Sequence, residues 1–284
     1  MIRALRWGRS AYETEADLQA EVEALQALGV LLECCESGNP SLDGVVILVV
    51  TSGVKVDEEI LLRAESLKLV VTTTSGFDHI DVSTARSRGI MLGRCPNARR
   101  DAVVDTSIAM GMGIVRSMPQ LQRRAQSGIW ARDELPKLAP RRVRGLKVGV
   151  IGAGVIGQRA IDQWQSLGAE VRFHDPARPG SIALDALCQW VDLLTLHCSL
   201  GPDSNQLLNA ERIGRLRAGT VVINTARGDC IDLDALFALT KRFCCVQIGN
   251  CVILLVAVPS SIYCMVLSMG ILIGFLGSIR FVEV

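Results

Sequence analysis

Residues 147–157 read Lys-Val-Gly-Val-Ile-Gly-Ala-Gly-Val-Ile-Gly, an apolar run that ends in the glycine pattern G-x-G-x-x-G. The run predicts a buried strand, and the residues from 156 to 167 predict a helix, so the glycines fall in the turn between them. The next predicted strand, 170–174, ends at Asp175. A glycine turn between a strand and a helix, followed by an acidic residue on the next strand, is typical of dinucleotide-binding domains.

Each glycine has its own predicted task in this turn. Gly152 permits the tight turn, Gly154 lets a pyrophosphate approach the backbone, and Gly157 lets the helix pack closely on the strand. The carboxylate of Asp175 accepts hydrogen bonds from ribose hydroxyls and repels a 2′-phosphate, so we expect NAD rather than NADP as cofactor. The less favoured alternative is that the glycines only pack a strand against a helix.

The composition excludes some classes of function. The chain has 284 residues, 49% of them hydrophobic and 21% charged, so it can bury a core. Lys and Arg number 30 and Asp and Glu 29, and aromatic residues make up 4%. A nearly neutral chain with few aromatic side chains lacks the positive field and the stacking surfaces on which nucleic-acid binding depends.

Strands and helices alternate along most of the chain, which indicates a parallel sheet covered on both faces. The further predicted strands are 44–50, 67–73, 191–196 and 220–224, and the predicted helices include 15–28 and 57–65. A long helix-compatible segment covers 100–127, and a loop covers 135–145. Arg141, Arg142 or Arg144 in that loop could contact a phosphate, although a solvated linker is the favoured interpretation.

Four further segments resemble the D-isomer-specific 2-hydroxyacid dehydrogenases: 74–81, 95–97, 197–209 and 224–232. The resemblance covers about residues 40 to 241. It implies an α/β fold, with a Rossmann-type doubly wound parallel sheet and a smaller flavodoxin-like α/β substrate domain, truncated at the C-terminus. The expected limits are 1–100 for the substrate domain, 101–243 for the NAD-binding domain and 244–284 for an aberrant hydrophobic tail.

The resemblance also assigns residues to the reaction. Arg227 is the expected catalytic residue, because a permanent cation can fork onto the substrate carboxylate and polarise the 2-oxygen. Ser75 and Gly76 are expected to hold that carboxylate. An ion pair of Arg227 with Asp229 or Asp232 is the alternative. The expected cofactor-binding residues are Thr106, Gly152, Gly154, Val155, Ile156, Gly157, Asp175, His197, Cys198, Thr225, Ala226 and Arg227.

A general base is missing from the expected place. The family uses a histidine oriented by a glutamate, both after the arginine motif, whereas His79, His174 and His197 all precede Arg227. The only acidic residue after Asp234 is Glu283. Without a group that moves the hydroxyl proton, we expect little or no turnover.

The C-terminal part differs in character from the rest. From Cys244 to Ile279 the chain carries no Asp, Glu, Lys or Arg. We interpret this segment as a truncation or frame change, with a membrane anchor over 251–277 as the alternative.

Met1–Gln26 has no apolar signal segment, and the 10 cysteines show no metal-ligand spacing, so we expect reduced thiols, no bound metal and a cytoplasmic protein.

Together these observations predict an NAD-dependent D-2-hydroxyacid dehydrogenase, equivalently a glyoxylate- or hydroxypyruvate-type 2-oxoacid reductase. The resemblance implies a homodimer acting on a small 2-hydroxy or 2-oxo acid. Two alternatives stay open: a non-catalytic NAD-sensing protein of the corepressor type, and a tail-anchored membrane form.

Overall fold

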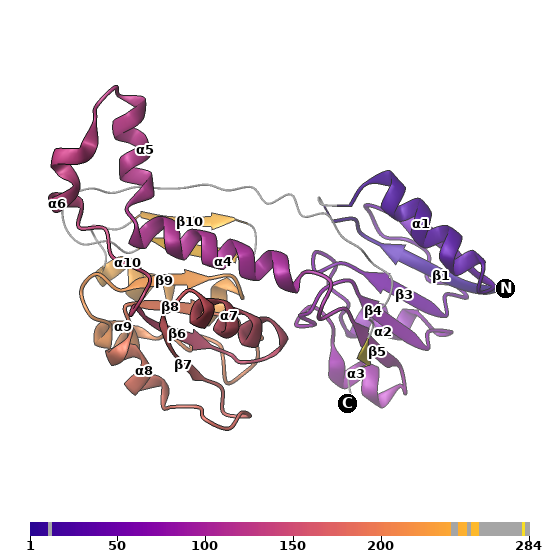
Figure 1. Ribbon diagram of the computed structural model, residues 1–284. Coiled ribbons are helices and arrows are strands. Elements are labelled where there is room, and N and C mark those ends of the chain that lie inside the picture. Colours follow the sequence, from indigo (N-terminus) through magenta and orange to yellow (C-terminus); the bar gives the residue numbers. More distant parts are fainter. Residues whose placement is uncertain (11–12, 240–243, 249–250, 256–279, 282–284) are drawn as a thin grey trace. The chain divides into compact units, whose positions relative to one another are not determined.

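The computed structural model describes residues 1–10, 13–239, 244–248, 251–255 and 280–281. It divides into two compact units, which are described separately: unit 1, built on Met1–Arg99 with Met269–Val284, and unit 2, Arg100–Ser268. The domain limits expected from the sequence stay predictions, because much of 244–284 lies outside the described residues. The α/β fold class is confirmed, since parallel strands connected by helices form both units (Figure 1).

Unit 1 contains a sheet in the order β12-β5-β4-β3-β1-β2. Strands β1 to β5 run parallel in the order 2-1-3-4-5 of flavodoxin-like folds, and β12 pairs antiparallel with β5. The strands are β1 Ile2–Trp7, β2 Val30–Cys35, β3 Ile47–Val50, β4 Leu69–Thr72, β5 Met91–Arg94 and β12 Arg280–Phe281. The helices are α1 Glu15–Gln26, α2 Glu58–Arg63 and α3 Val82–Ser87.

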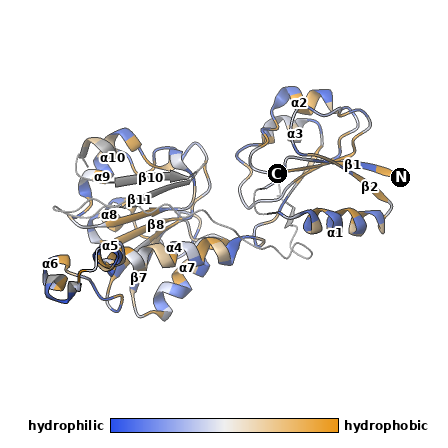
Figure 2. Ribbon diagram, turned by 90° about the horizontal axis from the view of Figure 1, so that it is seen from above, coloured by the Kyte–Doolittle hydropathy of each residue, from blue (hydrophilic) through white to orange (hydrophobic). Residues whose placement is uncertain are grey.

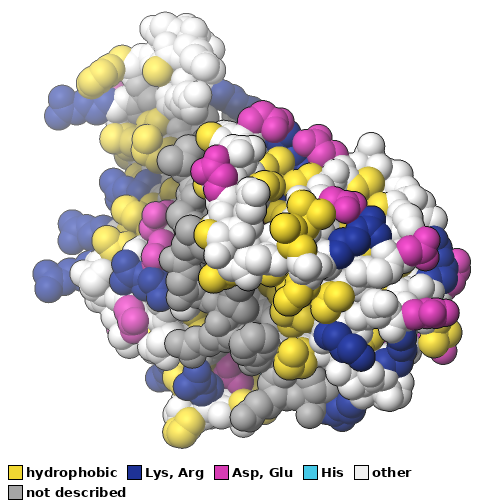
Figure 3. Space-filling model, turned by 90° about the vertical axis from the view of Figure 1, so that its right-hand side faces the viewer, with side chains coloured by type: hydrophobic (Ala, Val, Ile, Leu, Met, Phe, Trp, Pro, Cys, Tyr) yellow, Lys and Arg dark blue, Asp and Glu magenta, His cyan; other side chains and the backbone are white. Residues whose placement is uncertain are grey.

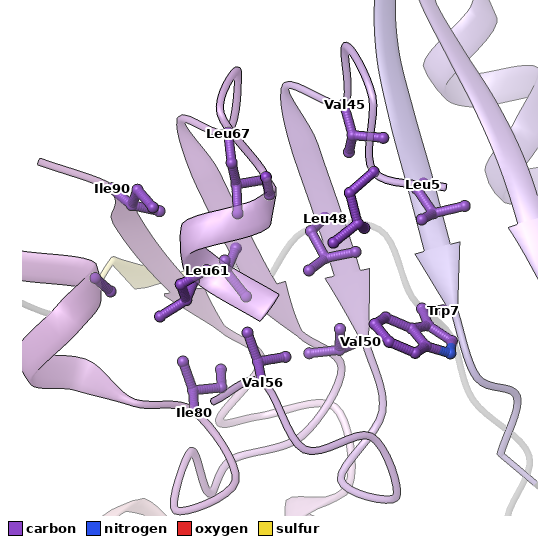
Figure 4. Close-up of a cluster of buried hydrophobic side chains, with 14 of the residues drawn as sticks. Leu5, Trp7, Val45, Leu48, Val50, Val56, Leu61, Leu67, Ile80 and Ile90 are labelled. Carbon is purple, nitrogen blue, oxygen red and sulfur yellow. The ribbon is translucent and has the colours of Figure 1, made fainter. Parts of the chain in front are cut away.

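The core of unit 1 forms where the apolar side chains of the central strands meet α2. Leu48 and Val50 on β3 pack with Leu61 of α2, and all three are fully buried (Figure 4). Each helix begins at a side chain that accepts a backbone hydrogen bond: Thr14 for α1, Asp57 for α2 and Asp81 for α3. The polar capping residue of each helix therefore stands where the apolar pattern of that helix begins.

Strand β1 was not predicted from the sequence. Its residues Ile-Arg-Ala-Leu-Arg-Trp interrupt the apolar pattern with two arginines. Arg6 is nevertheless buried, because its guanidinium pairs with Glu13 at 2.7 Å and also with Glu21. Desolvation of the Glu21 carboxyl raises its pKa, an effect that Arg6 opposes. β1 is therefore buried although its sequence is not continuously apolar, because the charge of Arg6 is paired inside an ion cluster.

Unit 2 contains a parallel sheet in the order β7-β6-β8-β9. Its strands are β6 Lys147–Ile151, β7 Glu170–His174, β8 Leu193–Leu196 and β9 Val221–Asn224. Its helices are α4 Arg100–Val115, α5 Met118–Gln126, α6 Leu135–Leu138, α7 Val155–Ser166, α8 Leu184–Trp190, α9 Ala210–Arg215 and α10 Leu233–Leu239, with short 3-10 turns η1 Ala131–Glu134 and η2 Gly228–Cys230. One core lies between the sheet and α4 with α7, and the other between the sheet and α8 to α10. The sheet is thus doubly wound.

Close packing of α4 on α7 and the sheet depends on Gly111. A Cβ at this position would lie 2.8 Å from the ring of Trp164 on α7 and 2.9 Å from Leu193 on β8.

Figure 2 shows hydrophobic strands inside each unit and mixed hydrophilic and hydrophobic helices around them. Acidic and basic side chains lie interspersed on the face shown in Figure 3, in keeping with a net charge of +1.

The helix-compatible segment 100–127 forms two helices, α4 and α5, rather than one. Ser117 adopts a left-handed conformation with φ of 57°, and a proline stands in the first turn of α5. Proline cannot donate the backbone hydrogen bond that would continue α4, so a second helix begins.

Arg141 is part of the packing of unit 2. Its backbone N–H donates to Val115, and its guanidinium donates to the carbonyl of Gly219 at 3.1 Å and lies 3.9 Å from Asp192. Gly219 and Asp192 precede β9 and β8, so Arg141 lies at the amino ends of the strands. The phosphate contact considered for Arg141 was therefore wrong, because phosphates bind beyond the carboxyl ends.

Part of the predicted tail is described. Strands β10 Cys244–Ile248 and β11 Cys251–Leu255 pair antiparallel, and β11 lies beside β9. Among the described residues, no helix has the length and apolar character needed to cross a membrane. Residues 256–279, which make up most of the segment considered as an anchor, lie outside the described part.

Candidate functional site

The predicted cofactor residues of unit 2 follow the carboxyl ends of its four parallel strands. Gly152 follows β6, Asp175 follows β7, His197 follows β8 and Thr225 follows β9. Parallel strands present these ends at one edge of the sheet. Strand β6 lies between β7 and β8, so the chain reverses its winding direction here. Ligands of open α/β sheets bind at such a switch point.

The first turn of the site tolerates only glycine at two positions. Gly152 has a φ of +85°, donates its N–H to the backbone carbonyl of His174 at 2.8 Å, and would place a Cβ 2.7 Å from the backbone of Cys198. A Cβ on Gly157 would lie 1.8 Å from the carbonyl oxygen of Gly152. Backbone therefore touches backbone at both positions, which is how α7 begins directly above the end of β6.

Gly154 differs from its two neighbours because the space beside it is open. A Cβ there would meet nothing within 4 Å. Gly154 is the N-cap of α7, and no side chain caps this end of the helix. The unpaired N–H groups of the first turn and the helix dipole favour an anion. Packing does not require a glycine at this position, whereas a closely approaching pyrophosphate does.

Asp175 is fixed beside the glycine turn. Its carboxylate accepts the N–H of Ala153 at 2.8 Å and the N–H of Ala177 at 3.1 Å. Its own N–H donates to the hydroxyl of Ser181 at 2.9 Å. A carboxylate that accepts one hydrogen bond on each oxygen keeps further lone pairs for ribose hydroxyls. Asp175 therefore lies beside the glycine turn, as the NAD prediction requires.

His197 joins the ends of β8 and β9. One ring nitrogen lies 3.0 Å from the hydroxyl of Thr195 and the other 3.3 Å from that of Thr225. Burial of the imidazole lowers the pKa of His197 to about 4, so the ring is neutral near pH 7. The ring therefore positions Thr225 beside β9 and brings no positive charge to the site.

The loop that carries Arg227 is shaped by Asn224, which is fully buried. The Asn224 side chain accepts the N–H of Ala226 at 3.0 Å and donates to the carbonyl of Arg227 at 2.7 Å. The guanidinium of Arg227 donates to the carbonyl of Ala226 at 3.0 Å. Asp232, an alternative ionic partner for Arg227, accepts the N–H of Ala235 at the start of α10. The turn after β9 thus has a defined shape.

The remaining predicted cofactor residues of unit 2 lie on three elements. The Thr106 hydroxyl donates to the carbonyl of Ala102 within α4, at 2.8 Å. Val155 and Ile156 form the first turn of α7. The sulfur of Cys198 lies 3.8 Å from that of Cys230. Their contacts with a cofactor stay predictions.

The predicted carboxylate-binding residues belong to unit 1. Ser75 and Gly76 follow β4 in a loop held by hydrogen bonds. The Thr74 hydroxyl donates to the carbonyl of Gly76 at 2.9 Å, and the Arg94 guanidinium donates to the carbonyl of Ser75 at 3.2 Å. The loop is therefore ordered by its own residues, and its role in substrate binding stays a prediction.

Three residues of the site were not singled out from the sequence: Thr195, Asn224 and Cys230. Thr195 and Asn224 are polar residues inside or at the end of apolar strands, and this signal points to a buried hydrogen-bonding task. His174, in contrast, has a structural partner, because its ring lies 2.8 Å from the carbonyl of Ile182. Among the described residues, no cluster of His, Cys, Asp or Glu could hold a metal ion.

The site can be compared with known proteins. Residues 108–243 match the model of the D-isomer specific 2-hydroxyacid dehydrogenase NAD binding domain. A D-3-phosphoglycerate dehydrogenase from Methanocaldococcus jannaschii is 30% identical over 206 residues, which cover 69% of this chain and 39% of that protein. A hydroxypyruvate reductase from Thermotoga maritima is 30% identical over 197 residues, 67% of this chain and 63% of that protein.

Solved structures agree with the sequence comparisons. A D-lactate dehydrogenase from Aquifex aeolicus, complexed with NAD and lactic acid, has a TM-score of 0.75 and 27% identity, covering 84% of this chain and 73% of that one. The chain spans 39%, 63% and 59% of the length of three of its curated relatives. Residues 108–243 therefore carry an NAD-binding domain of the D-isomer specific 2-hydroxyacid dehydrogenase type.

Proposed function

We propose that this protein binds NAD(H) and catalyses hydride transfer at C2 of a small 2-hydroxy or 2-oxo acid of the glyoxylate or hydroxypyruvate type. The observation that carries the proposal is the open space at Gly154 beside a fixed carboxylate. A Cβ there would meet no atom within 4 Å, while Asp175 accepts a hydrogen bond from the adjacent Ala153 at 2.8 Å. These residues fit a pyrophosphate and a ribose.

The chain's own residues supply the rest of the proposed chemistry. When bound, the nicotinamide donates or accepts the hydride. Arg227, on the loop after β9, is proposed to hold the substrate carboxylate and polarise the 2-oxo group. Ser75 and Gly76, in unit 1, stay the residues predicted from the sequence to donate backbone N–H groups to a substrate carboxylate. Asp175 disfavours a 2′-phosphate, so NADH is the proposed cofactor.

Proton transfer is the weak step of the proposed reaction. No histidine follows Arg227 in the sequence, and the neutral ring of His197 is already engaged by two threonines. Absence of general acid–base help lowers turnover by about 10²–10⁴-fold. Since typical kcat values are on the order of 10 s⁻¹, we expect turnover of about 0.1 s⁻¹ or less.

The proposal is tested by measuring NADH binding and NADH oxidation on the same purified sample. We expect saturable NADH binding, weaker NADPH binding, and slow oxidation that requires glyoxylate or hydroxypyruvate. Folded protein without affinity for NADH would contradict the proposal. Binding with no oxidation above the rate without protein would instead favour the NAD-sensing alternative of the corepressor type.

We further propose a homodimer, formed through the segment from α5 to α6. This segment extends away from the sheet of unit 2 (Figure 1). It exposes Trp130 by 83%, Met118 by 53% and Ile129 by 42%. Large apolar side chains exposed at both ends of α5 are the feature of unit 2 that suggests an interaction surface here. The protein is proposed to be cytoplasmic, and recovery in the membrane fraction after cell lysis would favour the tail-anchored form.

Replacing Trp130 by glutamate is expected to convert the dimer to a monomer of 30.7 kDa. The substitution places a charge where the proposed interface excludes water. Light scattering after size-exclusion chromatography measures the mass. Leu28→Glu is the matched control, since Leu28 is 77% exposed in unit 1 and its replacement should leave a dimer. A Trp130→Glu protein that stays dimeric would refute the proposed interface.

A further inference from the structure

Two cysteines lie together beside the glycine turn. The sulfurs of Cys198 and Cys230 are 3.8 Å apart, although the residues are distant in the sequence. Backbone hydrogen bonds hold the two loops together, so the proximity of the cysteines does not depend on a bond between their sulfurs. Leu208 donates its N–H to the carbonyl of Cys230 at 3.0 Å, and Gln206 donates to that of Asp229 at 2.6 Å. The loop after β8 and the loop after β9 are therefore already paired.

We propose that Cys198 and Cys230 form a disulfide by exchange with a low-molecular-weight disulfide, and that this modification weakens dinucleotide binding. A disulfide needs a sulfur–sulfur distance of about 2.05 Å, so the two side chains must approach by roughly 1.8 Å. Their sulfurs are the only pair of described cysteine sulfurs for which the structure gives a direct contact. The bond itself goes beyond the proposed function, and its effect on NADH rests on that function.

The two thiols have different access to solvent, which sets the order of the steps. Cys198 is partly exposed and Cys230 is buried. The hydrogen bond that it donates to Cys230 and its burial raise the pKa of the Cys198 thiol, so this thiol must first lose its proton to solvent. The Cys198 thiolate then attacks one sulfur of the small disulfide and releases the first small thiol. The Cys230 thiolate then attacks the Cys198 sulfur of the mixed disulfide and releases the second. The two cysteine protons pass to the two released thiols, and the two electrons lost by the protein sulfurs reduce the small disulfide.

The local environment favours Cys230 as the second nucleophile. The Cys198 thiol donates to the Cys230 sulfur, and this hydrogen bond lowers the pKa of Cys230. The charge of Arg227 acts in the same direction. A thiolate is the reactive form of cysteine. In the mixed disulfide Cys198 has no proton left to donate, and the charge of Arg227 then remains to favour the Cys230 thiolate that resolves the bond. Cys188 is a contrast in the same core, because burial raises its thiol pKa to about 11.

Closure of the bond acts on both sides of the site. The backbone of Cys198 lies where a Cβ on Gly152 would approach within 2.7 Å, so a shift of Cys198 toward the glycine turn displaces that turn. The N–H of Cys230 donates to the carbonyl of Arg227 at 3.2 Å. A displacement of Cys230 therefore also moves the arginine loop. Both movements disturb groups that the proposed cofactor site requires.

The test exposes the reduced full-length protein to oxidised glutathione, traps free thiols by alkylation and maps the peptides by mass spectrometry. NADH affinity is measured before oxidation, after it, and after treatment with dithiothreitol. The variants are Cys198→Ser, Cys230→Ser and, as the matched control, Cys188→Ala. We expect a peptide cross-linked through Cys198 and Cys230 in wild type and Cys188→Ala, absent from both serine variants. We expect the NADH Kd to rise at least about threefold on oxidation and to recover after reduction, with no change on oxidation of Cys198→Ser, which keeps only the buried Cys230 of the pair.

Two results would overturn the proposal. One is that Cys198 and Cys230 stay free, or that Cys198 keeps a glutathione adduct without cross-linking. The other is a cross-linked protein with unchanged NADH affinity, which would refute the coupling to the cofactor site. Failure of the reduced protein to bind NADH would instead refute the proposed function, and the peptide map would still decide whether the bond forms.

Discussion

Alanine at position 154 is expected to weaken NADH binding by at least about 100-fold while the protein stays folded. The backbone angles of Gly154, φ of −71° and ψ of −160°, suit any residue, and its Cβ would meet nothing within 4 Å. The added methyl group therefore causes no strain in the free protein. It occupies the space through which the pyrophosphate reaches the N–H groups of α7. Loss of hydrogen bonds to a charged group costs about 1.5–3 kcal/mol each, and each 1.4 kcal/mol is tenfold in affinity.

Fluorescence titration with NADH and thermal unfolding of the same samples would check this prediction. Gly214→Ala is the matched control, because a methyl group on Gly214 in α9 would also meet no atom within 4 Å, and this residue lies outside the site. It should bind NADH like wild type. Wild-type affinity in Gly154→Ala would show that no phosphate approaches this turn. A lower melting temperature in Gly154→Ala would show that the fold itself requires glycine at this position, independently of phosphate binding.

The strand–turn–helix of the cofactor site could be predicted from the sequence because its pattern and its structure are both local. Strands β6 and β7 have the predicted bounds, Lys147–Ile151 and Glu170–His174. Continuous apolar runs bounded by glycines leave few alternatives there. The parallel order of the sheet follows from the alternation of strands and helices. The position of Asp175 beside the turn follows in turn from that order.

Other features depend on contacts between distant residues and had no local signal. β1 contains Arg6, whose burial depends on Glu13 and Glu21. The break after α4 combines a left-handed Ser117 with a proline, and the first of these is not visible in a sequence. The proximity of Cys198 and Cys230 results from the pairing of two loops. Hydrophobic periodicity describes one element at a time, so it cannot supply such pairs.

Alanine at position 157 is expected to destabilise unit 2 by about 3 kcal/mol or more, the largest stability change among these predictions. Its Cβ would lie 1.8 Å from the carbonyl oxygen of Gly152, and that atom cannot retreat freely. Gly152 itself packs against the backbone of Cys198, where a Cβ would come within 2.7 Å. Overpacking a well-packed interior costs about 1–3 kcal/mol, occasionally more, and here the closest opposing atoms belong to backbone. The better helix propensity of alanine offsets only about 1 kcal/mol.

Urea unfolding followed by tryptophan fluorescence measures this change, because Trp164 is fully buried in the same helix, α7. Gly113→Ala is the matched control: it introduces the same residue into another helix of unit 2, α4, where a Cβ would meet nothing within 4 Å. Its free energy of unfolding should stay unchanged or rise by up to about 1 kcal/mol. Equal stabilities of Gly157→Ala and Gly113→Ala would mean that α7 does not start in contact with the turn. The pyrophosphate cradle, whose shape depends on that contact, would then have to be abandoned as well.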